Sequence, residues 1–289
     1  MPDWSSLYQQ LEVEGVHVSP GVSPAPVSGG DISAAWRLAS TNGDLFIKTG
    51  RKSSADMFAA EADGLAELAR PGSILAPRLI ATGQCESLAF LALEWLHLEA
   101  AGPKVQHQMG EQLAELHRTT SDRFGWHRDN SIGLTPQINN WHGNWVDFYR
   151  EHRLEFQLRL ATDNGFRGDL QDRGSRLLKR LPIYFDHTEP LASLLHGDLW
   201  SGNWACCEGR PAIFDPAVYY GDRETDIAMT RLFGGFSTAF YDAYEDAWPL
   251  SEGHEERQHL YQLYHVLNHL NLFGSGYLGR AIGLMDKLL

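Results

Sequence analysis

The chain has 289 residues, and its 24 Lys and Arg against 37 Asp and Glu give a formal net charge of −13 at pH 7. This length can bury a sizeable core, in one large domain or in two lobes. The acidic surface repels nucleic acid and anionic membranes, so we expect neither as a partner.

Cysteine usage and the amino terminus favour a soluble, cytoplasmic protein. The three cysteines include the adjacent pair Cys206 and Cys207 but no C-x-x-C spacing, which argues against a disulfide framework and a zinc knuckle. Residues 1–4 lack the basic and apolar regions of a secretion signal, and no apolar run reaches the length of a membrane span.

The first segments of the chain predict a short helix followed by a glycine turn. Residues 4–11 are predicted to form the helix, and residues 16–27 an extended segment interrupted by three prolines. Gly29 and Gly30 follow between two strand-like runs, where a tight turn would let backbone amides approach phosphate oxygens closely. Two glycines alone more often mark an ordinary hairpin, so the phosphate interpretation depends on the neighbouring elements.

Lys48 and Glu61 are predicted to form an ion pair. After an Asn-Gly turn at residues 42–43, residues 45–49 alternate as a strand with Lys48 and Phe46 on one face. In the helix predicted over residues 54–69, Glu61 falls on the apolar stripe. Because a carboxylate on a buried face needs a cation, Lys48 is the nearest upstream candidate. A strand lysine paired with a helix glutamate is the phosphate-holding arrangement of kinases.

Two further strands, predicted over residues 77–82 and 88–95, lead to a candidate nucleotide hinge. In a kinase, the backbone of Glu94, Trp95 and Leu96 would contact the edge of adenine, although any strand that leaves a sheet has the same signature. We expect an antiparallel-sheet lobe over residues 1–96 and a larger, mostly helical lobe over residues 97–289. The chain would cross between the lobes near residues 100–103.

Beyond this crossing the sequence predicts mainly helices. They are expected over residues 105–118, 144–161, 166–181 and 257–273, and residues 126–140, rich in Gly, Asn and Pro, are expected to form a long loop. Aromatic residues around that loop are expected mainly in the core, with some open to an acceptor pocket. His265 and His269 are four apart and could bind a metal, but the lack of a nearby acidic or Cys partner favours packed or solvated roles.

The strongest chemical pattern is His-Gly-Asp-Leu-Trp-Ser-Gly-Asn at residues 196–203, followed by Asp215 in Ile-Phe-Asp-Pro. Phosphoryl transfer needs a carboxylate that faces the acceptor hydroxyl, and oxygen ligands for Mg²⁺. Asp198 can supply the first, and Asn203 and Asp215 the second, which is the kinase spacing. Asp and Asn also cap turns, and the isolated pattern is common, but the context favours the catalytic interpretation.

Residues 219–229 read Tyr-Tyr-Gly-Asp-Arg-Glu-Thr-Asp-Ile-Ala-Met and are typical of a loop that enters a helix, with acidic residues in the first turn. Two roles are open to Asp226 in this segment, contact with substrate and support of the catalytic loop. We expect Asp226 to anchor the catalytic loop.

Taken together, these motifs resemble the fructosamine kinase (ketosamine-3-kinase) family from about residue 15 to the carboxy terminus. The motifs are Gly-Gly-Asp-Ile at 29–32, Lys48, Glu-Ala-Asp-Gly-Leu at 61–65, Gly-Glu-Gln-Leu-Ala-Glu-Leu-His at 110–117, the segments 196–203 and 220–229, and Asp-Pro-Ala at 215–217. The tract from Phe-Gly-Trp at 124–126 through Pro-Gln-Ile-Asn at 136–139 to Trp145 is similar to that family's helical-lobe signature. Aminoglycoside and choline phosphotransferases share His-Gly-Asp and Asp-Pro but not the remaining combination.

The resemblance implies an α+β, two-lobed protein-kinase-like fold that transfers the γ-phosphoryl group of ATP to the 3-hydroxyl of a ketosamine, as a small molecule or a glycated protein side chain. It implies that Asp198 accepts the proton and that Asn203 and Asp215 bind Mg²⁺. It also implies that Lys48, held by Glu61, grips the α- and β-phosphates. Gly29 and Gly30 would lie above the phosphates, and Glu94, Trp95 and Leu96 would contact adenine. An ordinary carboxylate, ionised at pH 7, is sufficient for the role of Asp198.

The sequence departs from protein kinases at two positions near the catalytic residues, and two alternative functions stay open. Gly197 stands where protein kinases have Arg, and Pro216-Ala217 where they have Phe-Gly, so regulation through a phosphorylated activation loop is not expected. A phosphotransferase for another sugar, an aminoglycoside or a choline-like amine is the first alternative. A non-catalytic nucleotide-binding module is the second, and the joint presence of the lysine, two aspartates and asparagine named above argues against it.

Overall fold

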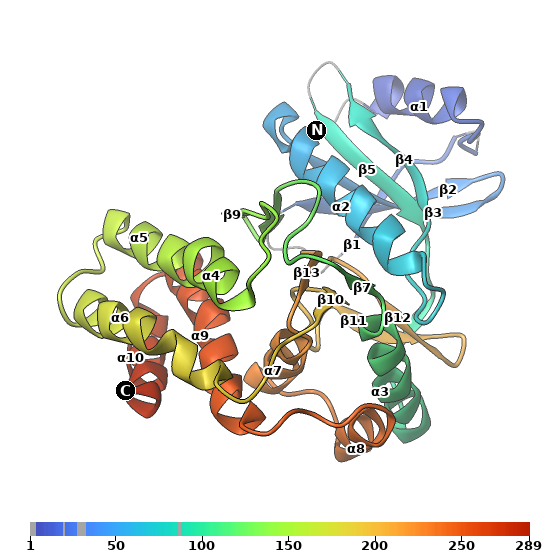
Figure 1. The fold of residues 1–289 in the computed structure, drawn as a ribbon. Helices are drawn as coiled ribbons and strands as arrows, with labels where there is room; N and C mark the ends of the chain where they lie inside the picture. The colour runs from blue at the N-terminus through green and yellow to red at the C-terminus, as the bar shows by residue number, and fades with distance from the viewer. Residues whose placement is uncertain (1–3, 20, 28–32, 86–87) are drawn as a thin grey trace.

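The computed structural model describes residues 4–19, 21–27, 33–85 and 88–289, which form two lobes (Figure 1). The predicted turn glycines Gly29 and Gly30 lie outside these ranges. Within the described ranges, none of the helices combines the length and the apolar character that crossing a bilayer requires.

The amino-terminal lobe is a five-stranded antiparallel sheet in the order β1-β2-β3-β5-β4. Its elements are α1 (Trp4–Val13), β1 (Ala25–Val27), β2 (Ala34–Ser40), β3 (Gly43–Gly50), the short 3₁₀ turn η1 (Lys52–Ser54), α2 (Ala55–Ala69), β4 (Leu79–Gln84) and β5 (Ala89–Glu94). Side chains alternate along β3, so Leu45 and Ile47 pack in one core with Leu7 and Leu11 of α1. The opposite face of the sheet packs against α2, and it is toward this face that Lys48 points.

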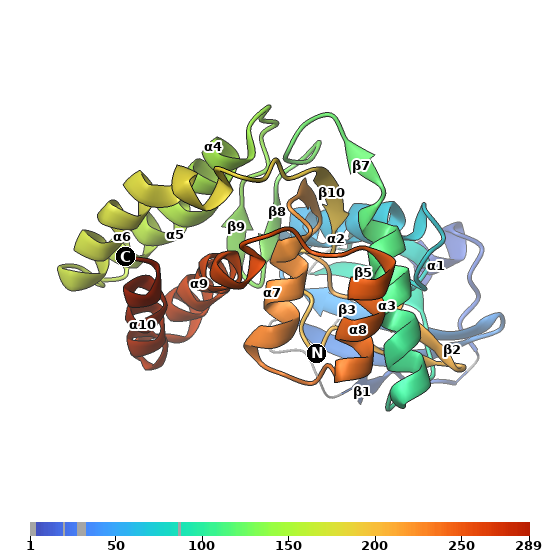
Figure 2. The ribbon, with the colours of Figure 1, turned by 60° about the horizontal axis from the view of Figure 1, so that its bottom comes forward.

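The second lobe is mostly helical and is organised around α9. Its helices are α3 (Pro103–His117), α4 (Trp145–Tyr149), α5 (Phe156–Asp163), α6 (Asp169–Arg180), α7 (Glu224–Leu232), α8 (Thr238–Ala247), α9 (His254–Phe273) and α10 (Leu278–Leu288), with the π-helical segment η2 (Arg150–Glu155) and the 3₁₀ turns η3 (Leu181–Phe185) and η4 (Ser275–Tyr277). The stripe formed by Leu260, Leu263, Leu267 and Leu270 is fully buried, which explains why α5, α7 and α10 pack around this helix. Helices α3 and α8 lie side by side at the other end of the lobe (Figure 2).

Three small sheets position the catalytic segment. Their strands are β6 (Leu98–Glu99), β7 (Thr120–Ser121), β8 (Asn130–Ile132), β9 (Thr135–Gln137), β10 (Ala192–Leu195), β11 (Trp204–Cys207), β12 (Arg210–Ile213) and β13 (Tyr219–Gly221), in the orders β13-β10-β7, β12-β11-β6 and β8-β9. The hairpin β11–β12 pairs Trp204 with Ile213, so the residues just outside it, Asn203 and Phe214, are brought together. Strand β10 delivers the chain to the first residue of the same segment, His196.

Most predicted elements are confirmed, and two segments differ. The predicted loop over residues 126–140 contains the hairpin β8–β9, which is held by polar side chains: Asn130 donates to the Val218 carbonyl at 2.8 Å, and Gln137 donates to Asn130 at 2.9 Å. The helix predicted over residues 144–161 is divided into α4 and α5 by the π-helical segment η2. Neither feature changes the hydrophobic pattern of the sequence, so neither was predictable from it.

Candidate active site

Lys48 lies between two carboxylates that come from different lobes. Its Nζ is 2.7 Å from Glu61 Oε1 on α2 and 2.5 Å from Asp215 Oδ1, two residues after β12. The predicted ion pair with Glu61 is therefore present. Burial alone would lower the pKa of Lys48, but the charges of Glu61 and Asp215 outweigh burial and raise that pKa, so the ammonium group stays charged. The Asp215 side chain is 42% exposed, against 13% for the other two, and is the open end of this arrangement.

The β11–β12 hairpin places Asn203 between the two predicted catalytic aspartates. Its Nδ2 donates to the Asp198 carbonyl at 2.9 Å and is 3.4 Å from both Asp198 Oδ2 and the Asp215 carbonyl. Asp215 has a φ of 56°, in the left-handed region that non-glycine residues rarely adopt. Such backbone strain persists where the surrounding structure imposes it, and here it turns the carboxylate toward Lys48. The structure thus brings together all four side chains predicted for phosphoryl transfer.

Asp226 holds the start of the catalytic loop through two backbone amides. Its carboxylate accepts the His196 amide at 2.8 Å and the Gly197 amide at 2.9 Å, and it lies 3.2 Å from His117 Nε2. Burial raises the pKa of Asp226, but hydrogen bonds from His117 and the Gly197 amide overcome burial and lower it. The group is therefore an ionised, fully buried anchor, as the sequence predicted, whereas His117 was not foreseen because it lies on the distant helix α3.

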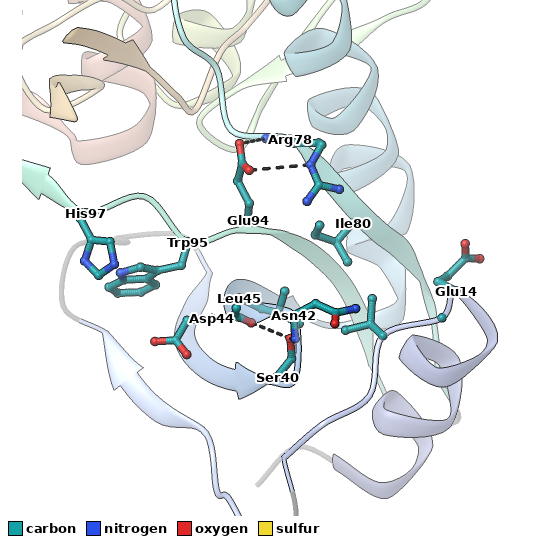
Figure 3. A pocket seen from close by; sticks show the side chains of 13 residues that line it. Glu14, Ser40, Asn42, Asp44, Leu45, Arg78, Ile80, Glu94, Trp95 and His97 are labelled. Atoms are coloured by element: carbon teal, nitrogen blue, oxygen red, sulfur yellow. Dashed lines mark hydrogen bonds and ion pairs between the residues drawn. The ribbon is translucent and has the colours of Figure 1, made fainter. Parts of the chain in front are cut away.

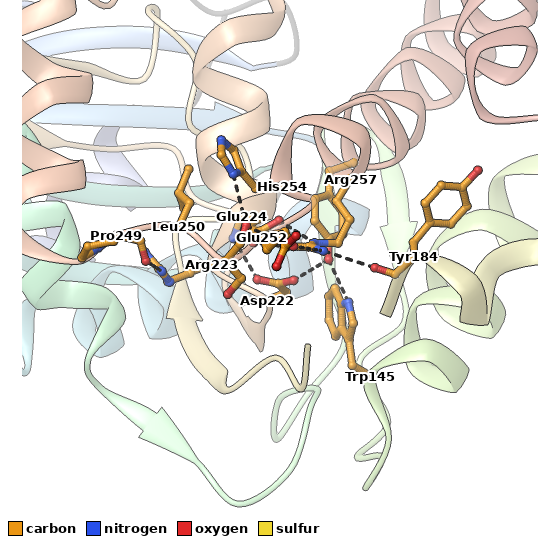
Figure 4. A network of polar contacts seen from close by, with 12 residues as sticks. Trp145, Tyr184, Asp222, Arg223, Glu224, Pro249, Leu250, Glu252, His254 and Arg257 are labelled. Carbon is orange, nitrogen blue, oxygen red and sulfur yellow. Dashed lines mark hydrogen bonds and ion pairs between the residues drawn. The ribbon is translucent and has the colours of Figure 1, made fainter. Parts of the chain in front are cut away.

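Helix α7, which carries Asp226, is fixed by a buried ion pair (Figure 4). Arg257 Nε and Nη2 donate to the two oxygens of Glu224, each at 2.8 Å, and the two side chains are 3% and 6% exposed. Beside this pair, Tyr261 donates to Asp222 at 2.5 Å and accepts from Trp145 at 3.0 Å. The Asp-Arg-Glu part of the sequence therefore serves to hold the first turn of α7 in place.

Asp198 differs from the ordinary carboxylate expected from the sequence. Burial, followed by the nearby charges of Asp215 and Asp226, raises the pKa of Asp198 to about 7, and the hydrogen bond from Asn203 only partly opposes this rise. A carboxyl group with a pKa near neutrality is well suited to accept a proton and release it again. The sequence could not reveal this value because Asp226, one of its causes, is brought close only by the fold.

The candidate hinge provides fewer free backbone groups than expected. The Glu94 amide donates to the Arg78 carbonyl, and the Trp95 amide to the Asp44 carbonyl, both at 3.0 Å. The Glu94 carboxylate turns toward Arg78 and accepts its amide at 2.9 Å (Figure 3). Of the three predicted adenine contacts, we therefore expect only Leu96 to donate a backbone amide.

A cavity of about 450 Å³ adjoins this hinge but is separate from the four catalytic side chains. It lies between the end of α1, the β2–β3 turn and the start of β4, and Glu94 and Trp95 form one of its walls (Figure 3). On the sheet, the Trp95 ring packs 6.3 Å from Phe46, which shares a face of β3 with Lys48. The aromatic ring, rather than the Glu94 side chain, is therefore the part of the hinge suited to contact a nucleotide base.

The catalytic loop also carries an exposed aromatic residue to which the sequence assigned no role. Trp200 follows Asp198 by two residues and is 39% exposed, an unusual position for so large an apolar ring. Its edge meets the Phe233 ring, with centroids 6.3 Å apart, and Phe233 in turn packs 4.9 Å from His269. His265 is buried and His269 half-buried, so both rings are packed, which is one of the two roles expected for this pair.

The donor atoms of the site fit Mg²⁺. The predicted ligands Asn203 and Asp215 offer oxygen atoms, the type of ligand that this hard cation prefers. Asn203 uses its Nδ2 for hydrogen bonds within the loop, which directs its amide oxygen to the opposite side. The exposed Asp215 carboxylate has one oxygen against Lys48 and a second for a cation. Neither residue is a histidine or a cysteine, so the pair does not favour zinc.

A family model described as fructosamine kinase matches residues 4–289 of this chain. The chain belongs to the fructosamine kinase family. A probable ketoamine kinase of Synechocystis sp. is 43% identical over 99% of this chain and 97% of its own length. The chloroplastic protein-ribulosamine 3-kinase of Arabidopsis thaliana is 39% identical over 91% of this chain and 81% of its own length. As a member of this family, the chain is a phosphotransferase with an alcohol group as acceptor.

Solved structures show the same relationship at the level of the fold. The crystal structure of a Haemophilus somnus protein named as a fructosamine-3-kinase superposes with a TM-score of 0.90 at 30% identity, over 99% of this chain and 97% of that one. A thermostable aminoglycoside phosphotransferase, solved with ADP and hygromycin B, gives 0.65 at 17% identity, over 98% and 96%. The predicted α+β, two-lobed kinase-like fold of this fructosamine kinase family member is confirmed.

Proposed function

We propose that this protein transfers the γ-phosphoryl group of ATP to the sugar 3-hydroxyl of a fructosamine or another ketosamine, carried by a small molecule or by a glycated protein side chain. The observation that carries the proposal is the meeting of Lys48 from one lobe with Asp215 from the other, next to Asn203 and Asp198. In a kinase these side chains have different tasks, and here they lie within one continuous set of contacts.

Each residue has a role that follows from its contacts. Lys48, held by Glu61, would bind the α- and β-phosphates, and Asp198 would accept the proton of the sugar hydroxyl late in a loose transition state. Asn203 and Asp215 would hold Mg²⁺, which when bound neutralises charge on the phosphate oxygens. Gly29 and Gly30 would cover the phosphates. In the hinge from Glu94 through Trp95 to Leu96, the Trp95 ring and the Leu96 amide would contact adenine.

The two lobes would divide these tasks between them. Residues 1–96 would form the nucleotide-gripping lobe and residues 97–289 the lobe with the catalytic loop and the acceptor site. Strand β6, at residues 98–99, supports this division because it already pairs with β11 of the second lobe. We further propose that the enzyme works in the cytoplasm, where ATP is supplied.

Two features support a cationic, sugar-bearing acceptor. The exposed Trp200 ring, two residues after Asp198 in the catalytic loop, offers a flat apolar surface of the kind on which the C–H face of a sugar packs. The amine nitrogen of a ketosamine is protonated at neutral pH, and a protein with a net charge of −13 attracts such cations over long range. We propose Trp200→Ala as a variant that raises KM for the acceptor while leaving KM for ATP unchanged.

The test is phosphoryl transfer from ATP to fructosyl-lysine and ribulosyl-lysine, with the new phosphoester located by ³¹P–¹H correlation NMR. A 3-phosphate on either sugar, absent with Asp198→Asn, is the expected result. Turnover of an aminoglycoside, choline or a free sugar in preference to both compounds would instead support the alternative acceptor class. Mg²⁺-dependent ATP binding without turnover of any acceptor would contradict catalysis altogether.

A further inference from the structure

Outside the phosphoryl-transfer site, three potential metal ligands converge on the surface of the helical lobe. His142 Nε2 is 3.2 Å from His152 Nε2 and 3.5 Å from Glu151 Oε2, and the ligand atoms of all three side chains lie within 4.8 Å of one another. The two imidazole rings stand nearly perpendicular, at 82°, with centroids 4.9 Å apart. Two ring nitrogens bound to one tetrahedral Zn²⁺ would lie about 3.3 Å apart.

The backbone fixes these three side chains from two independent elements. His142 precedes α4 and is locked by reciprocal backbone hydrogen bonds with Phe124, at 2.8 and 2.9 Å. Glu151 and His152 lie in η2, where the wider π-helical turn changes the direction in which the side chains leave the helix. The buried Phe148 ring supports both imidazoles, with its centroid 6.0 Å from His142 and 5.4 Å from His152.

We propose that His142, Glu151 and His152 form a binding site for one Zn²⁺ ion, with a water molecule in the fourth coordination position. Two imidazoles and one carboxylate are a common ligand set for zinc, and three protein ligands leave one position open. The Glu151 side chain is 51% exposed and that of His142 25% exposed, so the ion and its water can reach the site from solvent.

A neutral imidazole has the lone pair that a metal ligand needs, and the neighbouring cation does not block it. The Arg153 guanidinium does not compete for the site, because it is stacked 4.1 Å from the Tyr219 ring and donates to the Ile138 carbonyl and Asn139.

The site is chemically distinct from the proposed Mg²⁺ site. It offers two nitrogen ligands, whereas Asn203 and Asp215 offer oxygen, and Mg²⁺ competes poorly for imidazole. Zinc would join the loop before α4 to η2 across Phe148, and its binding free energy would then stabilise this corner of the lobe. A zinc titration in excess Mg²⁺ therefore separates this site from the proposed Mg²⁺ site.

The test is zinc binding by the purified chain in saturating Mg²⁺, measured by competition with a chromophoric chelator and by metal analysis after dialysis. Wild type should retain one Zn²⁺ per chain, and Co²⁺ in its place should give the intense visible absorption of four-coordinate cobalt. Glu151→Gln should weaken binding at least about 10-fold, and the double variant His142→Gln/His152→Gln at least about 100-fold. The matched control is His107→Gln, because the exposed pair His107 and Glu111, 3.5 Å apart, offers only two ligands.

Three results would overturn the proposal. The first is a wild-type chain that retains no more zinc than the double variant, which would mean that the two rings simply share a hydrogen bond. The second is zinc retained equally by all variants, which would place the ion elsewhere. The third is a loss of zinc binding in the control His107→Gln that equals the loss in the site variants. Should the double variant fail to fold, Glu151→Gln decides the outcome, because this side chain is half exposed and its replacement leaves the core intact.

Discussion

The backbone of Gly197 passes so close to Ala217 that a Cβ on residue 197 would lie 2.0 Å from the Ala217 carbonyl oxygen. The approach is fixed on both sides, since the Ala217 amide donates to His196 at 2.8 Å and the Gly197 amide donates to Asp226 at 2.9 Å. Gly197 also has a φ of 81°. No side chain fits at this position, which explains why the arginine that protein kinases place before their catalytic aspartate is absent here.

Gly197→Ala should therefore inactivate the enzyme and destabilise it by more than about 2 kcal/mol. The added methyl group would clash with the Ala217 carbonyl, and alanine is strained at the left-handed φ of this position. Gly165→Ala is the matched control: Gly165 has a φ of 92° but nothing within 4 Å of its Cβ position. The control should lose only about 1 kcal/mol and keep its activity. Urea unfolding and initial rates measure both, and equal losses in the two variants would contradict the steric explanation.

Glu61→Gln should lower kcat/KM for ATP about 100-fold, because Lys48 would lose the partner that aims it at the phosphates. Asp63→Asn on the same helix is the control. Asp63 lies on the exposed face of α2 and pairs with Arg128 at 2.5 Å, a surface contact worth less than about 1 kcal/mol. Steady-state kinetics with varied ATP would distinguish the two, and Glu61→Gln with the wild-type kcat/KM would show that Lys48 needs no support.

Asp198→Asn should reduce kcat by about 10²- to 10⁴-fold while leaving ATP binding intact. Asp215→Asn should instead lose metal-dependent ATP binding and activity together, since Asp215 is a proposed metal ligand. Turnover and nucleotide titrations on the same samples separate these effects. Near-normal turnover by Asp198→Asn would mean that another group accepts the proton.

The raised pKa of Asp198 makes a second prediction about the same variant. Because the folded pKa of about 7 exceeds the unfolded value of about 3.9, the folded state holds the proton more tightly, and stability declines as pH rises through this range. Asp198→Asn removes this decline. The variant should melt at a higher temperature than wild type at pH 8, and the difference between their melting temperatures should be smaller at pH 5. A variant that melts lower at both values would show that the carboxylate supports the fold.

His265→Leu should make the free energy of unfolding depend less on pH in the acid range. Burial, followed by His269 and Arg153, lowers the pKa of His265 to about 3, and its Nδ1 is buried with no hydrogen-bond partner among the described residues. Between an unfolded pKa of about 6.5 and this folded value, only the unfolded chain takes up the proton, so wild type loses up to about 1.4 kcal/mol per pH unit on acidification. As the pH falls from 6 to 4, the stability of the variant relative to wild type should therefore rise by up to that amount for each pH unit.

The control for this prediction is Leu263→Ala on the same helix. Leu263 is fully buried and does not titrate, so its truncation should destabilise the protein by about the same amount at every pH. Urea unfolding from pH 4 to pH 7 measures all three proteins. Parallel curves for wild type and His265→Leu would show that the imidazole does not contribute to acid sensitivity.

The sequence predicts the parts of the site that depend on local residue patterns and on the need of a buried charge for a partner of opposite charge. The Lys48–Glu61 pair follows from strand alternation, helix periodicity and the cost of an unpaired buried carboxylate. Asn203 and Asp215 follow from the kinase spacing of the motif, and the hairpin that brings them together is seen only in the structure. Each of these inferences needs only residues that are near one another in the chain or on one face of an element.

What the sequence does not predict depends on contacts between distant elements. His117 reaches Asp226 across 109 positions, and the raised pKa of Asp198 requires Asp226 and Asp215 together. The hairpin β8–β9 has strands of three residues, one with a proline, too short to show alternation. The hydrogen bond from the Trp95 amide to the Asp44 carbonyl depends on the exact register of the sheet.

The bridge from Lys48 to Asp215 has a consequence for nucleotide entry. The lysine proposed to bind the triphosphate is also the partner of an aspartate from the opposite lobe. A nucleotide phosphate would therefore compete with this internal carboxylate for the same ammonium group. The contribution of Lys48 to nucleotide affinity is accordingly the difference between the two attractions, and not the full strength of the new one.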